Sequence, residues 1–172
     1  LKSNVALDYN SQRIHSIRIS STDQGGLSVQ EVFIINVLNS NDAPTDISLS
    51  PNGFKENLPQ SSLIGLLSSS DKDSSDSFTY SFVNQGTNDN AFFLIANNEL
   101  RTSSVFDFET QSLYVIEVQT RDNSGLTFTR QLTVNVLDSN DVPTALAISS
   151  DSLIEKSLKG TFVANLLTTD QD

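Results

Sequence analysis

The chain repeats itself at an interval of 99 residues. Residues 37–45, Val-Leu-Asn-Ser-Asn-Asp-Ala-Pro-Thr, align with residues 136–144, Val-Leu-Asp-Ser-Asn-Asp-Val-Pro-Thr, and the alignment reaches both ends of the chain without a gap. Acidic residues keep the same register, as in the pairs Asp8 and Asp107, Glu56 and Glu155, and Asp71 and Asp170. A period of about a hundred residues is too long for a helical solenoid and suits a small β-sandwich.

One full period shows the pattern of strands rather than helices. Tyr114, Ile116 and Val118 alternate with more polar residues, and similar alternation covers residues 78–82 and 132–136. Further strands are predicted at residues 63–67 and 92–96, and turns at residues 51–53, 84–86 and 122–125. We therefore expect an all-β fold with about seven strands per repeat in two packed sheets.

The repeat sets the expected domain boundaries. Residues 1–43 should be the C-terminal part of one repeat, residues 44–142 a complete repeat, and residues 143–172 the N-terminal part of a third. A partial sandwich leaves apolar faces and strand edges open. The simplest explanation is that the chain belongs to a longer array; the alternative is that neighbouring chains complete each other by strand addition.

The net charge of the chain favours some classes of binding partner over others. Ten Lys and Arg stand against 21 Asp and Glu, a net charge of -11, which disfavours nucleic acid. Carboxylates suit hard cations such as Ca²⁺, which bind oxygen ligands. Cysteine is absent, so no disulfides form, and no apolar run approaches the length of a membrane span.

Five motifs resemble the calcium motifs of cadherin repeats. They are residues 56–57 (Glu-Asn), 71–73 (Asp-Lys-Asp), 106–109 (Phe-Asp-Phe-Glu), 120–125 (Thr-Arg-Asp-Asn-Ser-Gly) and 138–143 (Asp-Ser-Asn-Asp-Val-Pro). Their wording is closest to bacterial-style cadherin-like repeats. The resemblance implies tandem seven-stranded Ig-like Greek-key β-sandwiches of the cadherin type, with up to three Ca²⁺ ions at each junction between repeats.

The resemblance also implies a ligand set at each junction. At the second junction it comprises Glu56, Asp107, Glu109, Asp138, Ser139 (carbonyl), Asn140, Asp141, Val142 (carbonyl), Asp170 and Asp172. These include seven carboxylates, or -7 against +6 from three Ca²⁺ ions. Without metal the like charges should repel and loosen the joint.

The first junction has fewer acids in the matching positions. Its expected set is Asp8, Asn10, Asn39, Ser40, Asn41, Asp42, Ala43, Asp71, Asp73 and Asp122. Asn10 stands where the family has Glu, and Asn39 where it has Asp. Each replacement removes a negative charge, so we predict lower occupancy there, or one fewer ion.

The acidic residues and the single histidine also have explanations that involve no metal or catalysis. Asp and Asn favour turns, so some of these acids could be solvated turn residues. The only histidine, His15, aligns with Tyr114 on the inward face of a strand and is expected to be packed, and with no cysteine an enzyme is not expected.

Two functions remain. The first is a calcium-stiffened extracellular spacer or adhesion array in a large surface, matrix or filament protein. The second is a carbohydrate-binding module of a surface protein or polysaccharide-degrading system. Expected partners are the neighbouring repeats, with further copies of the chain or a surface glycan as additional candidates, and the expected location is the cell surface or an extracellular filament.

Overall fold

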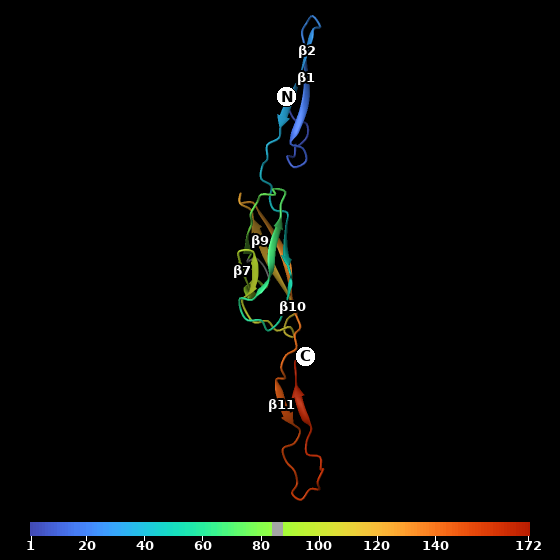
Figure 1. Ribbon diagram of the computed structural model, residues 1–172, viewed down its shortest axis with the longest axis vertical. Coiled ribbons are helices and arrows are strands. Elements are labelled where there is room, and N and C mark those ends of the chain that lie inside the picture. Colours follow the sequence, from blue (N-terminus) through green and yellow to red (C-terminus); the bar gives the residue numbers. More distant parts are fainter. Residues whose placement is uncertain (84–87) are drawn as a thin grey trace.

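The computed structural model describes residues 1–83 and 88–172 and is built from strands arranged along one long axis (Figure 1). A β-hairpin lies at each end, and a β-sandwich lies between them. The sole helical element among the described residues is a single 3-10 turn, Asn90–Phe92. None of the helical structure described could cross a membrane.

The central sandwich has two four-stranded sheets. The first sheet has the order β3 (Asp46–Ser50), β5 (Leu63–Ser70), β8 (Glu99–Thr102) and β7 (Phe93–Ala96). The second has the order β4 (Gly53–Lys55), β10 (Thr127–Leu137), β9 (Leu113–Arg121) and β6 (Thr79–Phe82). Neighbouring strands are antiparallel except β4 and β10, which are parallel. The expected all-β Ig-like sandwich is therefore confirmed.

The first strand of the sandwich is divided between the two sheets. β3 pairs with β5 in one sheet, and after the cis peptide bond Ser50–Pro51 the chain crosses to pair β4 with β10 in the other. Gly53, expected in a turn, is instead the first residue of β4. Residues 46–137 consequently contain eight strand segments rather than about seven strands, within the part that the structure describes.

Alternating residues of the two long strands form the core. In β9 every second residue from Tyr114 to Thr120 is buried, and in β10 Leu132, Val134 and Val136 are buried, as the sequence pattern predicted. Phe106 packs edge-on against Phe54 and Tyr114, each with its ring centroid 5.0 Å away. Because Phe106 is 2% exposed, this contact fixes the start of the loop that carries Asp107 and Glu109.

The shorter predicted elements deviate in detail. Residues 92–96 were expected to form one strand, but Phe92 belongs to the 3-10 turn and is 42% exposed, whereas Phe93 begins β7 and is buried. The expected turn after β9 is present, with Gly125 at φ 99° and its N–H donating to Asp122 Oδ1 (2.6 Å). The predicted turn at residues 84–86 lies outside the described residues.

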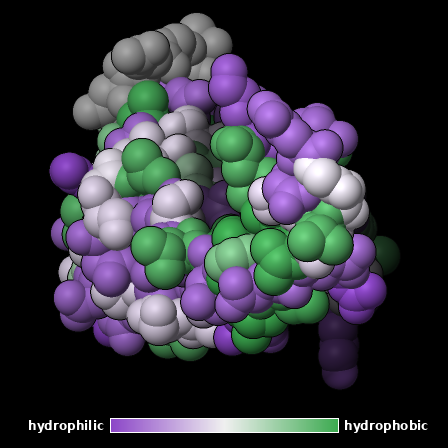
Figure 2. All heavy atoms as spheres, turned by 90° about the horizontal axis from the view of Figure 1, so that it is seen from above, coloured by the Kyte–Doolittle hydropathy of each residue, from purple (hydrophilic) through white to green (hydrophobic). Residues whose placement is uncertain are grey.

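The two end hairpins follow the 99-residue register. β1 (Ile14–Thr22) and β2 (Ser28–Asn36) pair antiparallel, as β9 and β10 do one period later, and β11 (Ala145–Ile148) pairs with β12 (Leu166–Thr169) as β3 pairs with β5. His15 in β1 is half-buried, as expected. Viewed along the long axis, apolar side chains lie exposed among hydrophilic ones (Figure 2).

Candidate metal centre

Glu56 joins the base of the sandwich to the linker that leaves it. The side chain is only 3% exposed. Its Oε2 accepts a hydrogen bond from the Phe108 N–H (2.7 Å), and its Oε1 accepts one from the Ser139 N–H (2.8 Å). One carboxylate therefore holds together the end of β4, the loop after β8 and the linker after β10.

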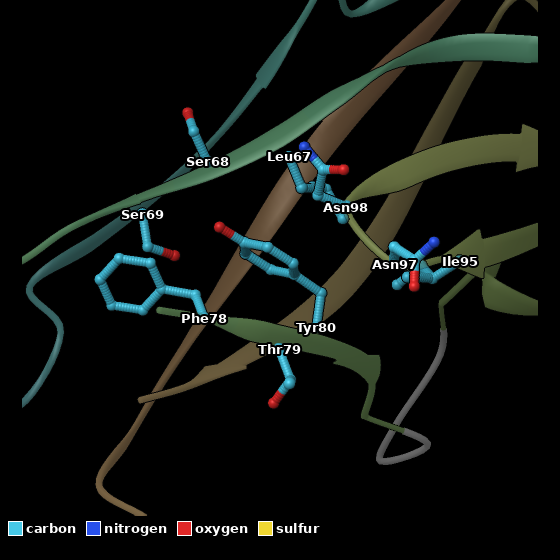
Figure 3. Close-up of a pocket in the computed structure, with 9 residues that line it drawn as sticks. All are labelled: Leu67, Ser68, Ser69, Phe78, Thr79, Tyr80, Ile95, Asn97 and Asn98. Carbon is cyan, nitrogen blue, oxygen red and sulfur yellow. The ribbon is translucent and has the colours of Figure 1, made fainter. Parts of the chain in front are cut away.

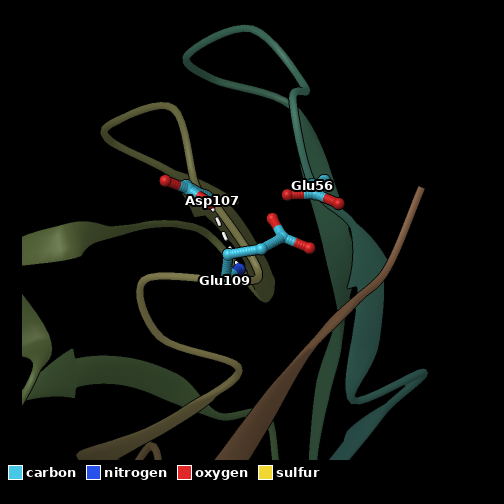
Figure 4. A group of neighbouring side chains, drawn as sticks. All are labelled: Glu56, Asp107 and Glu109. Atoms are coloured by element: carbon cyan, nitrogen blue, oxygen red, sulfur yellow. Dashed lines mark hydrogen bonds between the residues drawn. The ribbon is translucent and has the colours of Figure 1, made fainter. Parts of the chain in front are cut away.

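Asp107 and Glu109 bring two more carboxylates to Glu56. Carboxylate oxygens of the three residues lie within 4.8 Å of one another, and Glu109 points toward Glu56 (Figure 4). The Thr110 hydroxyl, which donates to Asp107 Oδ2 (2.7 Å), lowers the pKa of Asp107. A backbone hydrogen bond lowers the pKa of Glu109, but desolvation and the neighbouring carboxylates outweigh it, so the net pKa is raised.

A second group of carboxylates joins three separate segments. Oxygens of Glu109, Asp138 and Asp172 lie within 4.8 Å of one another. The linker and the segment after β12 are also joined directly, because the Asp141 N–H donates to Asp172 Oδ2 (2.6 Å). Acids from the sandwich, the linker and the following hairpin thus meet at one place.

The other residues expected at the second junction belong to neither of these carboxylate groups. The Asn57 side chain donates to Asp141 Oδ1 (2.7 Å), and the Asn140 side chain donates to the Asp141 carbonyl (2.6 Å). Among the described residues, the Asp170 carboxylate accepts a hydrogen bond from the Gln171 N–H (2.9 Å) and belongs to neither carboxylate group. Val142, expected to offer its carbonyl, is 79% exposed.

At the first junction, Asp122 and Asp73 tie the sandwich to the preceding linker. Asp122 is 5% exposed, and its Oδ2 accepts a hydrogen bond from the Asn41 side chain (2.8 Å). Desolvation opposes ionisation of Asp122, but the Asn41 amide and three backbone N–H groups lower its pKa overall. Asp73 Oδ2 accepts the Asp42 N–H (2.7 Å), the same contact that Asp172 and Asp141 make one period later.

The upstream side of the first junction consists of amides more than acids. The Asn10 side chain donates to Asp42 Oδ2 (3.3 Å), and the Asn39 side chain donates to Asp73 Oδ1 (2.8 Å), which lowers the pKa of Asp73. Asp8 binds the Ser11 hydroxyl (2.7 Å) and the Asn10 N–H (2.9 Å), both of which lower its pKa. Ser40 and Ala43, expected as carbonyl ligands, lie beside these residues in the linker.

Asp76 is a candidate ligand that the sequence reasoning missed. Carboxylate oxygens of Asp71, Asp73 and Asp76 lie within 4.8 Å of one another. Desolvation and then Asp71, Asp122 and Asp73 raise the pKa of Asp76. Its position three residues after Asp73 in an acidic loop was the available signal, but the 99-residue counterpart lies beyond residue 172, so the repeat could not reveal it.

The donors at both junctions fit calcium. They are carboxylate, amide and carbonyl oxygens, the ligands that Ca²⁺ takes in sets of about 6–8. Oδ2 of Asp71 and Oδ2 of Asp76 are shielded from solvent and have no hydrogen-bond partner. Buried carboxylate oxygens without a donor are costly, and a bound cation would satisfy them.

The fold and these acidic groups define a class: a β-sandwich repeat with clusters of carboxylates at its ends, next to the linkers. Comparison with known proteins gives the family. Residues 53–137 match the model of the cadherin domain. The sandwich is therefore a cadherin-type domain, and the relatives that the chain matches are protocadherins, not enzymes.

Relatives and solved structures agree with that assignment. Human protocadherin gamma-B6 is 28% identical over 176 residues, which cover 96% of this chain and 19% of the relative. Human protocadherin Fat 4 is 30% identical over 176 residues, which cover 96% of this chain and 4% of the relative. Extracellular cadherin domains 1–4 of protocadherin gamma B7 superpose with a TM-score of 0.65 at 27% identity, covering 96% of this chain and 42% of that one. A cis-dimer structure of protocadherin gammaB7 superposes with a TM-score of 0.55 at 26% sequence identity, covering 98% of this chain and 42% of that one. The chain thus spans about a fifth or less of these curated relatives.

Proposed function

We propose that the chain is part of a calcium-stiffened extracellular adhesion or spacer array. Residues 1–43, 44–142 and 143–172 would be portions of three successive repeats, each joined to the next through shared Ca²⁺. The observation that carries this proposal is the meeting of Glu109, Asp138 and Asp172, which come from the sandwich, the linker and the following hairpin.

The chemistry of the junction explains how calcium would stiffen it. Carboxylates on different segments repel each other when no cation lies between them, so the segments would move apart. Residues such as Glu56, Asp107 and Glu109 would hold the ion from the sandwich, and Asp138, Asp141 and Asp172 would hold it from the linker and the next repeat. Bound Ca²⁺ supplies the positive charge that lets these segments stay together.

The partners follow from the same geometry and from the relatives. The first partner of each repeat is its neighbour in the chain, through the two linkers. The gammaB7 structure described as a cis-dimer adds a second class of partner, another copy of such an array. The location supported by relatives described as extracellular cadherin domains is the cell surface or an extracellular filament.

Small-angle X-ray scattering with and without a calcium chelator tests this function. In Ca²⁺ the chain should show the long, narrow distance distribution of a rod; in chelator the distribution should broaden and shorten as both linkers bend. Equilibrium dialysis on the same sample should find bound calcium. A rod of unchanged shape in chelator, or no bound calcium, would contradict the proposal.

Carbohydrate binding stays a second candidate because the sandwich has a cavity with suitable chemistry. A cavity of about 610 Å³ opens between β5, β6 and the β7–β8 turn. It is lined by the rings of Phe78 and Tyr80 and by Asn97 and Asn98 (Figure 3). Aromatic faces beside amide groups suit a sugar ring. Retention on insoluble polysaccharide that Asn98→Ala abolishes would favour this function; no retention would exclude it for this chain.

A further inference from the structure

The two junctions differ most at three matched positions. Asn10 replaces Glu109, Asn39 replaces Asp138, and Lys72 replaces Gln171. Over the seven positions of the first junction, namely Asp8, Asn10, Asn39, Asp42, Asp71, Lys72 and Asp73, the formal charge is -4 + 1 = -3. Over the counterparts Asp107, Glu109, Asp138, Asp141, Asp170, Gln171 and Asp172 it is -6. The first junction is therefore less negative by three charges.

Two of these replacements, Asn10 and Asn39, fall on the carboxylate group that joins the repeats. Glu109, Asp138 and Asp172 form a group of three carboxylates at the second junction. Their counterparts at the first junction are Asn10, Asn39 and Asp73, so one carboxylate remains of three. That carboxylate accepts a hydrogen bond from the Asn39 amide (2.8 Å), so protein donors already satisfy it.

Lys72 reaches the same place from the sandwich side. Its Nζ lies 3.8 Å from Asp42 Oδ1, while the Asn10 side chain donates to Asp42 Oδ2 (3.3 Å). Lys72 also lines a cavity of about 310 Å³ at this junction, together with Asp8, Asn10, Asn39 and Asp42. Lys72 thus shares the lining of one polar space with the acids and amides of the first junction.

We propose that Lys72 acts as a built-in cation that takes the place of one Ca²⁺ ion on the upstream side of the first junction. This inference rests on the proposed calcium function. The ammonium group balances part of the charge of Asp42, and the Asn10 and Asn39 amides satisfy the remaining oxygens by hydrogen bonds. The side chains of Lys72 and Asp42 are 55% and 38% exposed, so the pair is a weak, salt-sensitive contact, and its main effect is to repel an arriving cation.

The consequence is a chain with two unlike joints. The second junction needs metal to bring its acids together. The first keeps direct contacts between its linker and the sandwich, such as Asn41 to Asp122 and Asn39 to Asp73, without needing a cation on the upstream side. The carboxylates of Asp71 and Asp76, whose Oδ2 atoms have no hydrogen-bond partner among the described residues, are left as the place for calcium at the first junction.

Calcium binding to three variants tests the role of Lys72. Lys72→Gln copies the second junction at one position, and the triple variant Asn10→Glu, Asn39→Asp, Lys72→Gln copies it at all three. Lys159→Gln is the matched control, since it removes the same charge from an exposed turn far from both junctions. Stoichiometry is measured by native mass spectrometry, affinity by calorimetric titration, and folding by circular dichroism.

The expected results separate this inference from the proposed function. Lys72→Gln should tighten the weakest class of sites roughly tenfold, the effect of removing one unit charge ~6 Å from Ca²⁺ at a dielectric constant of ~80. The triple variant should bind one more ion, and Lys159→Gln should match the wild type. If the wild type binds calcium and both junction variants bind it with the same affinity and stoichiometry, the role of Lys72 is overturned and the proposed function is not. Absence of calcium binding in every protein would overturn the proposed function and this inference with it.

Discussion

The carboxyl groups at the junctions fall into two electrostatic kinds. Asp8, Asp73 and Asp107 accept hydrogen bonds from nearby hydroxyl, amide or backbone groups, which lower their pKa values. Asp76 and Glu109 are desolvated and also crowded by other carboxylates, and both effects raise their pKa values. Hydrogen bonds favour the ionised form of Asp8, Asp73 and Asp107. The ionised forms of Asp76 and Glu109 are repelled by neighbouring carboxylates, and a bound cation would relieve that repulsion.

Asp76→Asn should change stability in opposite directions with and without calcium. The pKa of Asp76 is raised, so its ionised form destabilises the fold in chelator at neutral pH. The variant should therefore melt higher than the wild type in chelator at pH 7. The gap should close as the pH falls through the raised pKa toward 3.8, because wild-type Asp76 then becomes neutral.

In saturating calcium the order should reverse, because the variant loses a carboxylate ligand. Thermal unfolding followed by circular dichroism measures both conditions, and Asp89→Asn, outside the acidic groups, is the control. A variant that melts below the wild type in chelator at pH 7 would contradict the proposed repulsion.

Glu56→Gln should weaken the fold even in the absence of metal. An amide can accept a backbone N–H at one end only, so one of the bonds from Phe108 and Ser139 is lost and a buried N–H is left unpaired. The expected cost is about 1–3 kcal/mol. Urea unfolding in chelator measures it, with Glu99→Gln as control, since Glu99 pairs with Arg101 at the partly exposed surface. Equal midpoints for the two variants would show that Glu56 does not tie the linker to the sandwich.

At the scale of elements, the sequence predicted the long strands well and the short ones poorly. Alternation identified β9 and β10 because each buries one face over many residues. β4 is only three residues long, too short for any period, and the crossing of the chain between sheets depends on contacts with β10. The Phe92 ring faces Tyr114 from a 3-10 turn, which no strand pattern could show.

The candidate site was predictable to the extent that the repeat covered it. Acids with a partner 99 residues away were found, whereas Asp76 has its counterpart outside the sequence. Sequence alone also gave no indication that Asp170 would remain apart from the carboxylate groups, because its orientation depends on the irregular segment after β12. Side-chain direction at a junction is set by tertiary contacts rather than by local pattern.

Gly65 in β5 lies too close to the crossing chain to accommodate a side chain. The register with β8 shifts between Leu63 and Gly65, and a Cβ added at Gly65 would come closer than 3.0 Å to the Pro51 carbonyl oxygen. Gly65→Ala should therefore destabilise the domain by about 1–3 kcal/mol as β5 is pushed from the crossing chain.

Gly53→Ala is the matched control for that variant. An added Cβ there meets the Asn135 carbonyl oxygen at 3.5 Å, an ordinary contact. Urea unfolding at fixed calcium compares the two variants. If Gly65→Ala were as stable as Gly53→Ala, the close passage of β5 against residues 50–52 would not constrain the fold.

At the scale of the whole molecule, stiffness depends on the two linkers, because the sandwich itself is held by a continuous core. Residues 38–45 and 138–144 contain no strand and connect the three parts along the long axis (Figure 1). Each linker places acids against the neighbouring sandwich or hairpin. The angles between the parts would therefore respond to divalent cations, while the sandwich would keep its fold in their absence.

Limited proteolysis should detect that response at each linker separately. Glutamyl endopeptidase, which needs no metal ion and also cleaves after Asp, can cut at Asp42 in the first linker and at Asp138 and Asp141 in the second. In chelator we expect faster cleavage in the second linker, where repulsion between carboxylates opens the junction, than in the first, which keeps direct contacts to the sandwich. A resistant fragment containing the sandwich should remain because the core stays packed. Glu155, 85% exposed in a turn away from both junctions, provides an internal control that should be cut under all conditions.

Calcium titrated into the same digest should protect the linkers in a defined order. The second linker should become resistant at a lower calcium concentration than the first. The second junction has six acids at the matched positions, whereas Asn10, Asn39 and Lys72 reduce the attraction for Ca²⁺ at the first. Mass spectrometry of the fragments over time gives the rate at each bond, normalised to Glu155. Protection of the first linker at a lower calcium concentration than the second would contradict the assigned order of affinities. Equal cleavage rates with and without calcium, at a constant rate of cleavage after Glu155, would show that calcium does not order the linkers.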